Sequence, residues 1–266
     1  MKKYFTIFTL SWQDELTYRL NFVLWRVRNI LRLLLTYFLW SGVFLVNSKI
    51  AGYSSGQMLT YVFLVLVVQS IVLSAPSGDS MGGEIGSGDL SNYLVKPVNY
   101  LKYWFTRDIA SKCLNLVFAA GEITLLWFWL QPPVSLPANF PALMGFLALL
   151  ICGILIYFFF EASARFIAFW TPEYTWGLAF LTMVFIETLS GMIFPLDLLP
   201  GSIKTFLDFT PFPYLIYYPI SVYVGRITGP AIFVIITKAV IWVFILSRLS
   251  RFIWSRGLKV YGAEGR

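Results

Sequence analysis

Histidine is absent from this sequence, and charged residues are scarce. Only 12% of the 266 residues are Asp, Glu, Lys or Arg, against about 25% in an ordinary soluble domain. Without histidine, the chain cannot carry Ser-His-Asp or Cys-His catalysis, histidine-ligated haem or an HExxH zinc site. The two cysteines, Cys113 and Cys152, lie in apolar runs and are expected to be small buried side chains rather than a disulfide framework. Any chemistry of the chain itself would have to use carboxylates, lysine or tyrosine.

Nucleotide-binding patterns are missing as well. The phosphate loop GxxxxGK[ST] needs a lysine after its second glycine, and no glycine in this sequence is followed by lysine. Gly86, Ser87 and Gly88 lack the third glycine of a dinucleotide loop. The string continues to Asp89 and so matches the GxGD of intramembrane aspartyl proteases, but no predicted span holds the second aspartate that such an enzyme needs. We therefore expect no nucleotide site, no metal and no bound cofactor in this chain.

Apolar residues are what the sequence has in abundance, with 58% hydrophobic and 19% aromatic side chains. A helix needs about 20 apolar residues to cross the hydrocarbon layer, and six segments qualify or nearly do. They are residues 30–46, 57–75, 113–131, 141–160, 176–194 and 229–247. The sequence thus predicts an all-α membrane protein with six transmembrane helices, forming a single transmembrane domain over residues 1–266. Ahead of the spans, Phe5, Phe8, Trp12 and Leu16 recur at helical spacing and predict an amino-terminal helix in the membrane interface.

The basic residues predict the orientation, because cytoplasmic loops carry an excess of Lys and Arg. Sixteen of the twenty basic residues fall before the first span, between the second and third, just after the fourth, or after the sixth. Both termini are therefore predicted to be cytoplasmic. Topology and anionic lipid headgroups account for the net charge of +7, so no nucleic-acid partner is expected.

Two connections are long enough to have a structure of their own. The outer one, residues 195–228, contains five prolines that prevent one continuous helix, yet it is too apolar for a free loop. Short re-entrant helices that dip into the outer leaflet satisfy both facts. The alternative is an extracellular loop with an unusually apolar surface.

The other long connection, residues 76–112, is predicted to be cytoplasmic. Leu90, Tyr93 and Leu94 recur at helical spacing, Asp89 can cap the first turn, and Pro97 ends the element. The preceding glycines are expected to form a turn from which this short amphipathic helix projects. Its apolar face would pack on a partner protein or on the cytoplasmic ends of the chain's own helices.

Three stretches give the sequence a resemblance to a known family. They are "GGEIGSGDLSNYLVKPVNYL" between the second and third spans, "FPLDLLPGSIKTFLDFTPFPYLIYYPISVYVG" before the last, and "SRGLKVYGAEGR" at the end. In this order and placement they resemble the permease subunits of ATP-binding-cassette exporters of the ABC-2 type.

The resemblance implies a division of labour between chains. ATP and magnesium would be bound by a separate ABC ATPase subunit, and the permease would work beside a second permease, as a homodimer or a related heterodimer. The loop between spans two and three would hold the coupling helix that seats in the ATPase. The contact candidates on this chain are Glu84, Asp89, Leu90, Tyr93, Leu94 and Lys96. The implied place is the plasma membrane of a prokaryote, and the implied cargo is a lipid, glycan, peptide or hydrophobic small molecule moved outward.

Ionisable residues inside spans each need an explanation, because they cost about 2.5 to 3.5 kcal/mol at mid-bilayer. Glu122, Glu187 and Lys238 lie within predicted spans. They either line an export path or form a structural pair of Lys238 with one of the glutamates. Glu161 and Arg165 have the spacing of a helical ion pair near the cytoplasmic boundary.

Another interpretation remains open from these charges. A secondary transporter or channel could use them directly, and it would need an ion gradient and no ATPase. A lipid-modifying enzyme is disfavoured because no DxxD-type metal motif is present, and a scaffold without transport does not explain the intramembrane charges.

Overall fold

A computed structural model describes residues 2–17, 19–46, 48–76 and 80–262. Over these ranges every regular element is helical, and a single bridge between Ile50 and Tyr53 is the only extended pairing. The all-α prediction is confirmed. The last four residues of the third family-like stretch, 263–266, and residues 77–79 of the predicted cytoplasmic loop lie outside the described residues.

Five helices of the described part are long and apolar enough to cross a membrane. They belong to α2 (Arg19–Val46), α3 (Ser55–Val72), α6 (Tyr100–Leu130), α7 (Phe140–Arg165) and α11 (Pro230–Gly257). The helix that contains the first predicted span is longer than that span, since α2 begins at Arg19 rather than near residue 30. Arg26, Arg28 and Arg32 lower the apparent hydropathy of its first half, but they form ion pairs within the protein, as described below.

The predicted fifth span, 176–194, is only partly helical. It corresponds to α8 (Thr175–Leu189), whose 15 residues extend about 22 Å at 1.5 Å per residue. After Ser190, Gly191 takes a positive φ of 84° that breaks the helix. A β-carbon on Gly191 would lie 2.8 Å from Cβ of Tyr217, so this turn depends on glycine.

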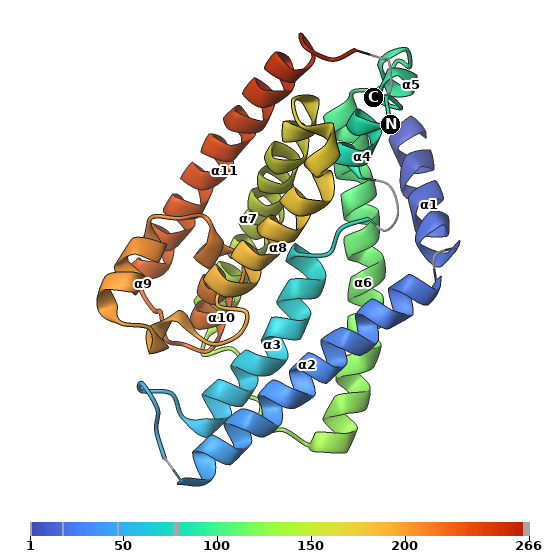
Figure 1. Cartoon of the computed structure of the whole chain (residues 1–266). Helices are drawn as coiled ribbons and strands as arrows, with labels where there is room; N and C mark the ends of the chain where they lie inside the picture. The colour runs from blue at the N-terminus through green and yellow to red at the C-terminus, as the bar shows by residue number, and fades with distance from the viewer. Residues whose placement is uncertain (1, 18, 47, 77–79, 263–266) are drawn as a thin grey trace.

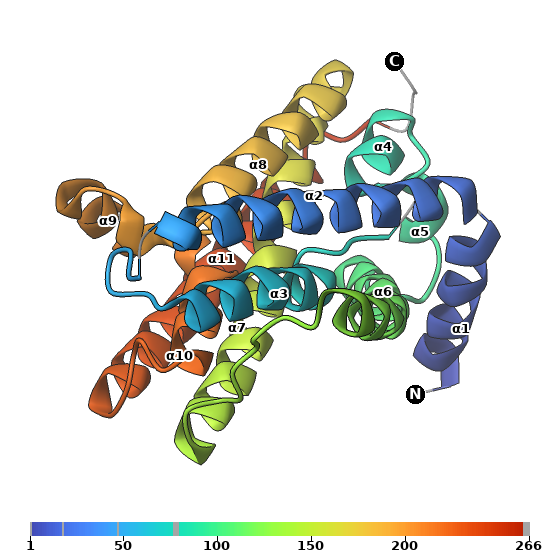
Figure 2. The ribbon, with the colours of Figure 1, turned by 90° about the horizontal axis from the view of Figure 1, so that it is seen from below.

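The two chain ends lie at the same end of the molecule (Figure 1). The short helices α4 (Met81–Gly86) and α5 (Ser91–Leu94) are also there, and we refer to it as the α4–α5 end. The opposite end, the α10 end, holds the α2–α3 connection and α10 (Tyr217–Tyr223). Seen from below, α2 runs between α8 and α3 (Figure 2).

The amino-terminal segment forms the expected helix, α1 (Lys2–Thr17), beside α6. Its buried residues are Ser11 and Glu15, whereas Phe5 is 74% exposed. Leu16 of the predicted apolar stripe is exposed as well, whereas Phe8 and Trp12 are half-buried, so part of the stripe is available to the membrane interface. Lys3 Nζ donates a hydrogen bond to the Pro97 carbonyl at 2.8 Å, which links α1 to the end of the α5 segment.

Capping residues explain where several long helices begin. Ser54 and Gln57 form a reciprocal capping box at α3. Asn99 and Asn139 accept hydrogen bonds from the first free amides of α6 and α7. The main core lies between α3, α7, α10 and α11 and includes the fully buried Leu149, Ile156 and Ile216.

Residues 195–228 form the short helices predicted from the prolines. They are η3 (Leu196–Leu198), α9 (Gly201–Asp208), η4 (Phe212–Tyr214) and α10. The helix α10 is buried against α7 and α3, whereas α9 presents Phe206 and Phe209 at 68% and 76% exposure. The depth of these elements in a membrane stays a prediction.

Asp197 ties this segment to the α2–α3 connection. Its carboxylate accepts hydrogen bonds from the hydroxyls of Tyr53 at 2.8 Å and Tyr217 at 2.6 Å, and it pairs with Lys204. Burial would raise the pKa of the Asp197 carboxyl, but these hydrogen bonds outweigh burial and hold the pKa below its usual value. Arg226 donates to the carbonyls of Ala51 and Gly52, both at 3.0 Å. At the α10 end, this polar cluster therefore joins residues 195–228 to the α2–α3 connection.

Candidate functional site

A cavity of about 700 Å³ lies between α2, α3, α6, α7 and α8. Polar and charged side chains from all five helices line it: Arg26, Arg28, Asn29, Arg32, Gln69, Ser70, Ser74, Asn115, Glu161, Arg165 and Glu187. Its apolar lining includes five aromatic side chains: Phe22, Trp25, Tyr157, Trp176 and Phe180. A pocket of this size with apolar walls and convergent polar groups has the general features of a small-molecule site.

The cavity lies in the half of the molecule near the α4–α5 end. Most of its lining comes from the first half of α2 and the last turns of α3 and α7, which point to that end (Figure 1). The helix α8 lines it along most of its length, from Trp176 to Glu187. By the predicted orientation, the half near the α4–α5 end is cytoplasmic.

One side of the cavity is held by a buried ion pair between Arg26 and Glu122. Arg26 Nε donates to Glu122 Oε1 at 2.6 Å, and a second guanidinium nitrogen contacts the other carboxylate oxygen. A third nitrogen donates to Asn115 Oδ1 at 3.2 Å and to Ser70 Oγ at 3.4 Å. Because the pair is bidentate and further hydrogen-bonded, its charges compensate each other away from water. It joins α2, α3 and α6.

Arg28 and Arg32 share one carboxylate. Both donate to the same oxygen of Glu187, at 2.9 Å and 2.7 Å, and the guanidinium of Arg28 lies 4.7 Å from the ring centre of Trp25. The side chains of Arg28, Arg32 and Glu187 are 39%, 27% and 25% exposed, respectively, and all three line the cavity. This group joins α2 to α8.

The predicted pair of Glu161 and Arg165 is confirmed at 3.0 Å, and both residues line the cavity. Polar residues of α6 also face the protein. Lys112 pairs with Asp108 at 2.8 Å and donates to the Ser74 carbonyl of α3. These contacts hold α6 against α3 near the cavity.

Within the described residues, Lys238 forms no ion pair with a glutamate, so the structure lends no support to the structural pairing. The ion pairs of Glu122 and Glu187 in the described residues are formed by arginines of α2 instead. Lys238 is exposed on α11 and is not among the cavity residues. Sequence reasoning also missed Arg26, Arg28 and Arg32 as site residues, because it placed Arg26 and Arg28 in a cytoplasmic segment before the first span and Arg32 at the start of that span.

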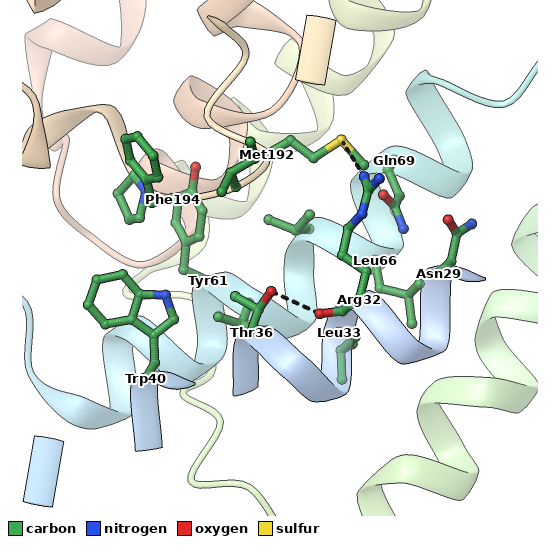
Figure 3. A pocket seen from close by; sticks show the side chains of 14 residues that line it. Asn29, Arg32, Leu33, Thr36, Trp40, Tyr61, Leu66, Gln69, Met192 and Phe194 are labelled. Carbon is green, nitrogen blue, oxygen red and sulfur yellow. Dashed lines mark hydrogen bonds between the residues drawn. The ribbon is translucent and has the colours of Figure 1, made fainter. Parts of the chain in front are cut away.

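A narrow pocket continues from the cavity toward the α10 end (Figure 3). The two spaces share Asn29, Arg32, Gln69 and Met192. Trp40, Tyr61 and Phe194 line the far side of the pocket, whose free volume of about 20 Å³ is close to that of one water probe. The Tyr61 hydroxyl donates to the Gly191 carbonyl at 2.6 Å. The space therefore narrows from the α4–α5 end to the α10 end.

The six predicted ATPase-contact residues have different surroundings. Glu84 is buried and accepts hydrogen bonds from Tyr100 Oη at 2.5 Å and Trp104 Nε1 at 3.0 Å. Leu90 is completely buried, and Tyr93 packs partly buried on the same cluster. The other three, Asp89, Leu94 and Lys96, are exposed. The burial of Glu84 and Leu90 speaks against direct side-chain contacts with a partner.

The secondary structure of this segment also differs from the prediction. Residues 81–86, expected as a turn, form α4, which Ser80 caps through the Gly83 amide. Asp89 is not the N-cap of α5, because that position is Leu90 and has no side-chain cap. The turn needs glycine at Gly88, whose φ is 85°. Asp89 instead accepts a hydrogen bond from Ser87 Oγ at 2.6 Å within the turn.

Tyr261, which follows α11, holds this turn in place through two hydrogen bonds. The Tyr261 hydroxyl donates to the Gly88 carbonyl at 2.7 Å and accepts from the Ser91 amide at 3.2 Å. On the same cluster the ring of Trp254, from α11, stacks on Tyr100 of α6 at 4.9 Å. The α4–α5 segment is thus packed on the ends of α6, α7 and α11.

Long apolar helices around a polar cavity are features of a multi-pass helical membrane protein. Residues 30–265 match the family described as ABC-2 family transporter protein, and the chain belongs to that family. Its members are transporter membrane subunits, generally not the catalytic ones, and work with ABC ATPase partners. A comparison with curated proteins found no match.

Proposed function

We propose that this chain is the permease subunit of an ATP-driven exporter in a prokaryotic plasma membrane. ATP and magnesium bind to a separate ATPase subunit, and a second permease, identical or related, completes the transporter. Family membership supports the ATPase partner. The cavity between α2 and α8 supports a cargo with an apolar part, because five aromatic side chains line it.

The shape of the cavity supports outward transport. It is wide at the α4–α5 end and continues toward the α10 end only as the narrow pocket of Figure 3. A cargo enters from the side where the ATPase docks and leaves through the α10 end after the helices rearrange. Alternating access of this kind needs two arrangements of the same helices with different affinities for the cargo.

The observation that carries the proposal is an exposed apolar tip on a well-anchored segment. Leu94 and Val95, at the end of α5, are 47% and 84% exposed, beside the exposed Lys96. Glu84 and Leu90 hold the same segment inside the protein. An ATPase that grips the tip therefore pulls on α6, α7 and α11 through the buried residues.

Association with a P-loop ATPase tests this function. We expect such an ATPase to co-purify with the chain, and Leu94→Asp with Val95→Asp to reduce the recovered ATPase at least tenfold. The matched control is Leu136→Asp at the α10 end, which is 85% exposed and is expected to keep the ATPase. The proposal fails if no ATPase is recovered with the unaltered chain while transport persists, the result expected for a secondary transporter or channel.

A further inference from the structure

The charges on the cavity wall do not balance. Four arginines line it, Arg26, Arg28, Arg32 and Arg165. Their ion-pair partners in the described residues are three carboxylates, those of Glu122, Glu187 and Glu161. Arg26 and Arg165 each have a carboxylate of their own, so the excess positive charge belongs to Arg28 and Arg32, which share Glu187.

Arg28 and Arg32 also have hydrogen-bond donors to spare. A guanidinium carries five N–H groups in a planar fork that matches a carboxylate or phosphate. Each of these arginines gives one nitrogen to Glu187, and Arg32 gives another to the Met192 sulfur at 3.5 Å, a weak acceptor. Both side chains line the cavity, and their guanidiniums attract an anion more strongly in a partly enclosed space than at an open surface.

The apolar part of the wall stands next to these donors. Trp25 lies under the Arg28 guanidinium, and Trp176 and Phe180 stack on each other at 5.7 Å on α8, the helix that carries Glu187. A ligand whose anionic head reaches Arg28 and Arg32 therefore places its remaining atoms against aromatic rings.

We propose that the cavity takes an amphiphile with a singly charged anionic head, a carboxylate or a phosphate diester. One of the two guanidiniums keeps Glu187 and the other takes the head, so that two cations face two anions. The aromatic wall of Phe22, Trp25, Trp176 and Phe180 holds the tail. This assignment names the cargo class of the proposed exporter and rests on that function for the direction of movement, whereas binding itself needs no ATPase.

The test is a fluorescence titration of the full-length permease, with any ATPase that co-purifies, in phosphatidylcholine nanodiscs. The probes are dansylaminoundecanoic acid and its methyl ester at a pH where the acid is ionised, with empty discs subtracted. We expect the acid to bind at least tenfold more tightly than the ester. Arg32→Gln should remove most of this preference, and Arg28→Gln should reduce it.

Two further variants separate a binding site from a structural role. Glu187→Gln frees both guanidiniums, so we expect the acid to bind several-fold more tightly. Lys238→Gln removes a positive charge outside the cavity and should change nothing. Equal binding of acid and ester overturns the proposal, and so does a loss of acid binding in Glu187→Gln protein that keeps the melting temperature of the unaltered chain.

The anionic head can belong to a membrane lipid or to a free amphiphile. Repeating the titration in discs that contain phosphatidylglycerol distinguishes these sources, because a lipid ligand displaces the probe and a separate cargo site does not. The outcome is also independent of the ATPase test. If the probe binds but no ATPase associates, the export function is refuted and the anion-binding site stands. If an ATPase associates but the acid is not preferred over the ester, only the anion-binding site is refuted.

Discussion

At the scale of single residues, the ion pair of Arg26 and Glu122 carries the largest energetic consequence. The two side chains are 6% and 12% exposed, and removing one partner of a buried pair leaves an uncompensated charge that costs about 3–5 kcal/mol. We therefore expect Glu122→Gln to lower the melting temperature strongly. The double variant Arg26→Met with Glu122→Met should recover much of the loss, because it removes both charges.

The melting temperature can be measured in nanodiscs with a thiol-reactive dye, which labels the free cysteines Cys113 and Cys152 as the protein unfolds during a temperature ramp. Lys238→Gln, at an exposed residue of α11, serves as the control for removing a charge inside a predicted span. An unchanged melting temperature in Glu122→Gln protein would show that the pair does not stabilise the fold.

The sequence could identify the membrane glutamates as residues that needed partners, but it could not find the partners. Hydropathy counted Arg26 and Arg32 against a span and assigned them to the cytoplasmic side. The structure continues α2 through them because Glu122 and Glu187 approach from α6 and α8, a tertiary contact that a local window does not contain. The four-residue spacing of Arg28 and Arg32, which places both on one helix face, was the available signal.

At the scale of elements, the α4–α5 segment depends on a contact from the other end of the sequence. Tyr261→Phe removes the hydroxyl that bonds Gly88 and Ser91 and keeps the ring beside Phe169. Losing a hydrogen bond of about 1 kcal/mol should speed amide hydrogen exchange in residues 86–96 by about two- to tenfold. Mass spectrometry of the exchanged protein measures this.

Tyr174→Phe provides the matched control, because Tyr174 is 64% exposed and lies in η2 (Pro172–Tyr174), which packs against α4. Its exchange profile should equal that of the unaltered protein. If Tyr261→Phe also leaves residues 86–96 unchanged, the carboxyl-terminal contact does not hold the segment.

The sequence predicted which segments are helical better than it predicted where each helix begins and ends. Prolines predicted the broken helices of residues 195–228, and four apolar segments lie within or largely within α3, α6, α7 and α11. The helical conformation of Met81–Gly86 was not predictable, since three of its six residues are glycine, which weakens an isolated helix. Packing of Met81 and Ile85 on Phe166 and Phe169 supplies what helix propensity lacks.

At the scale of the whole molecule, the arrangement of the chain ends determines how many times it crosses the membrane. An odd number of crossings puts the two ends on opposite sides, yet both lie at the α4–α5 end (Figure 1). We therefore predict that α8 crosses the membrane as a sixth span beside the five long helices. A crossing of 15 residues is shorter than the roughly 30 Å hydrocarbon layer, and local thinning of the bilayer can accommodate it.

Cysteine labelling of intact cells tests this arrangement. In a chain with Cys113→Ala and Cys152→Ala, we introduce Ser202→Cys on α9 or Lys259→Cys after α11, both at exposed positions. A membrane-impermeant maleimide should label residue 202 in intact cells and residue 259 only after permeabilisation, because α11 separates them. With both chain ends inside, a tag before residue 2 should resist external protease as well. Protease access to that tag in intact cells, with residue 259 still protected, would mean that α8 does not cross.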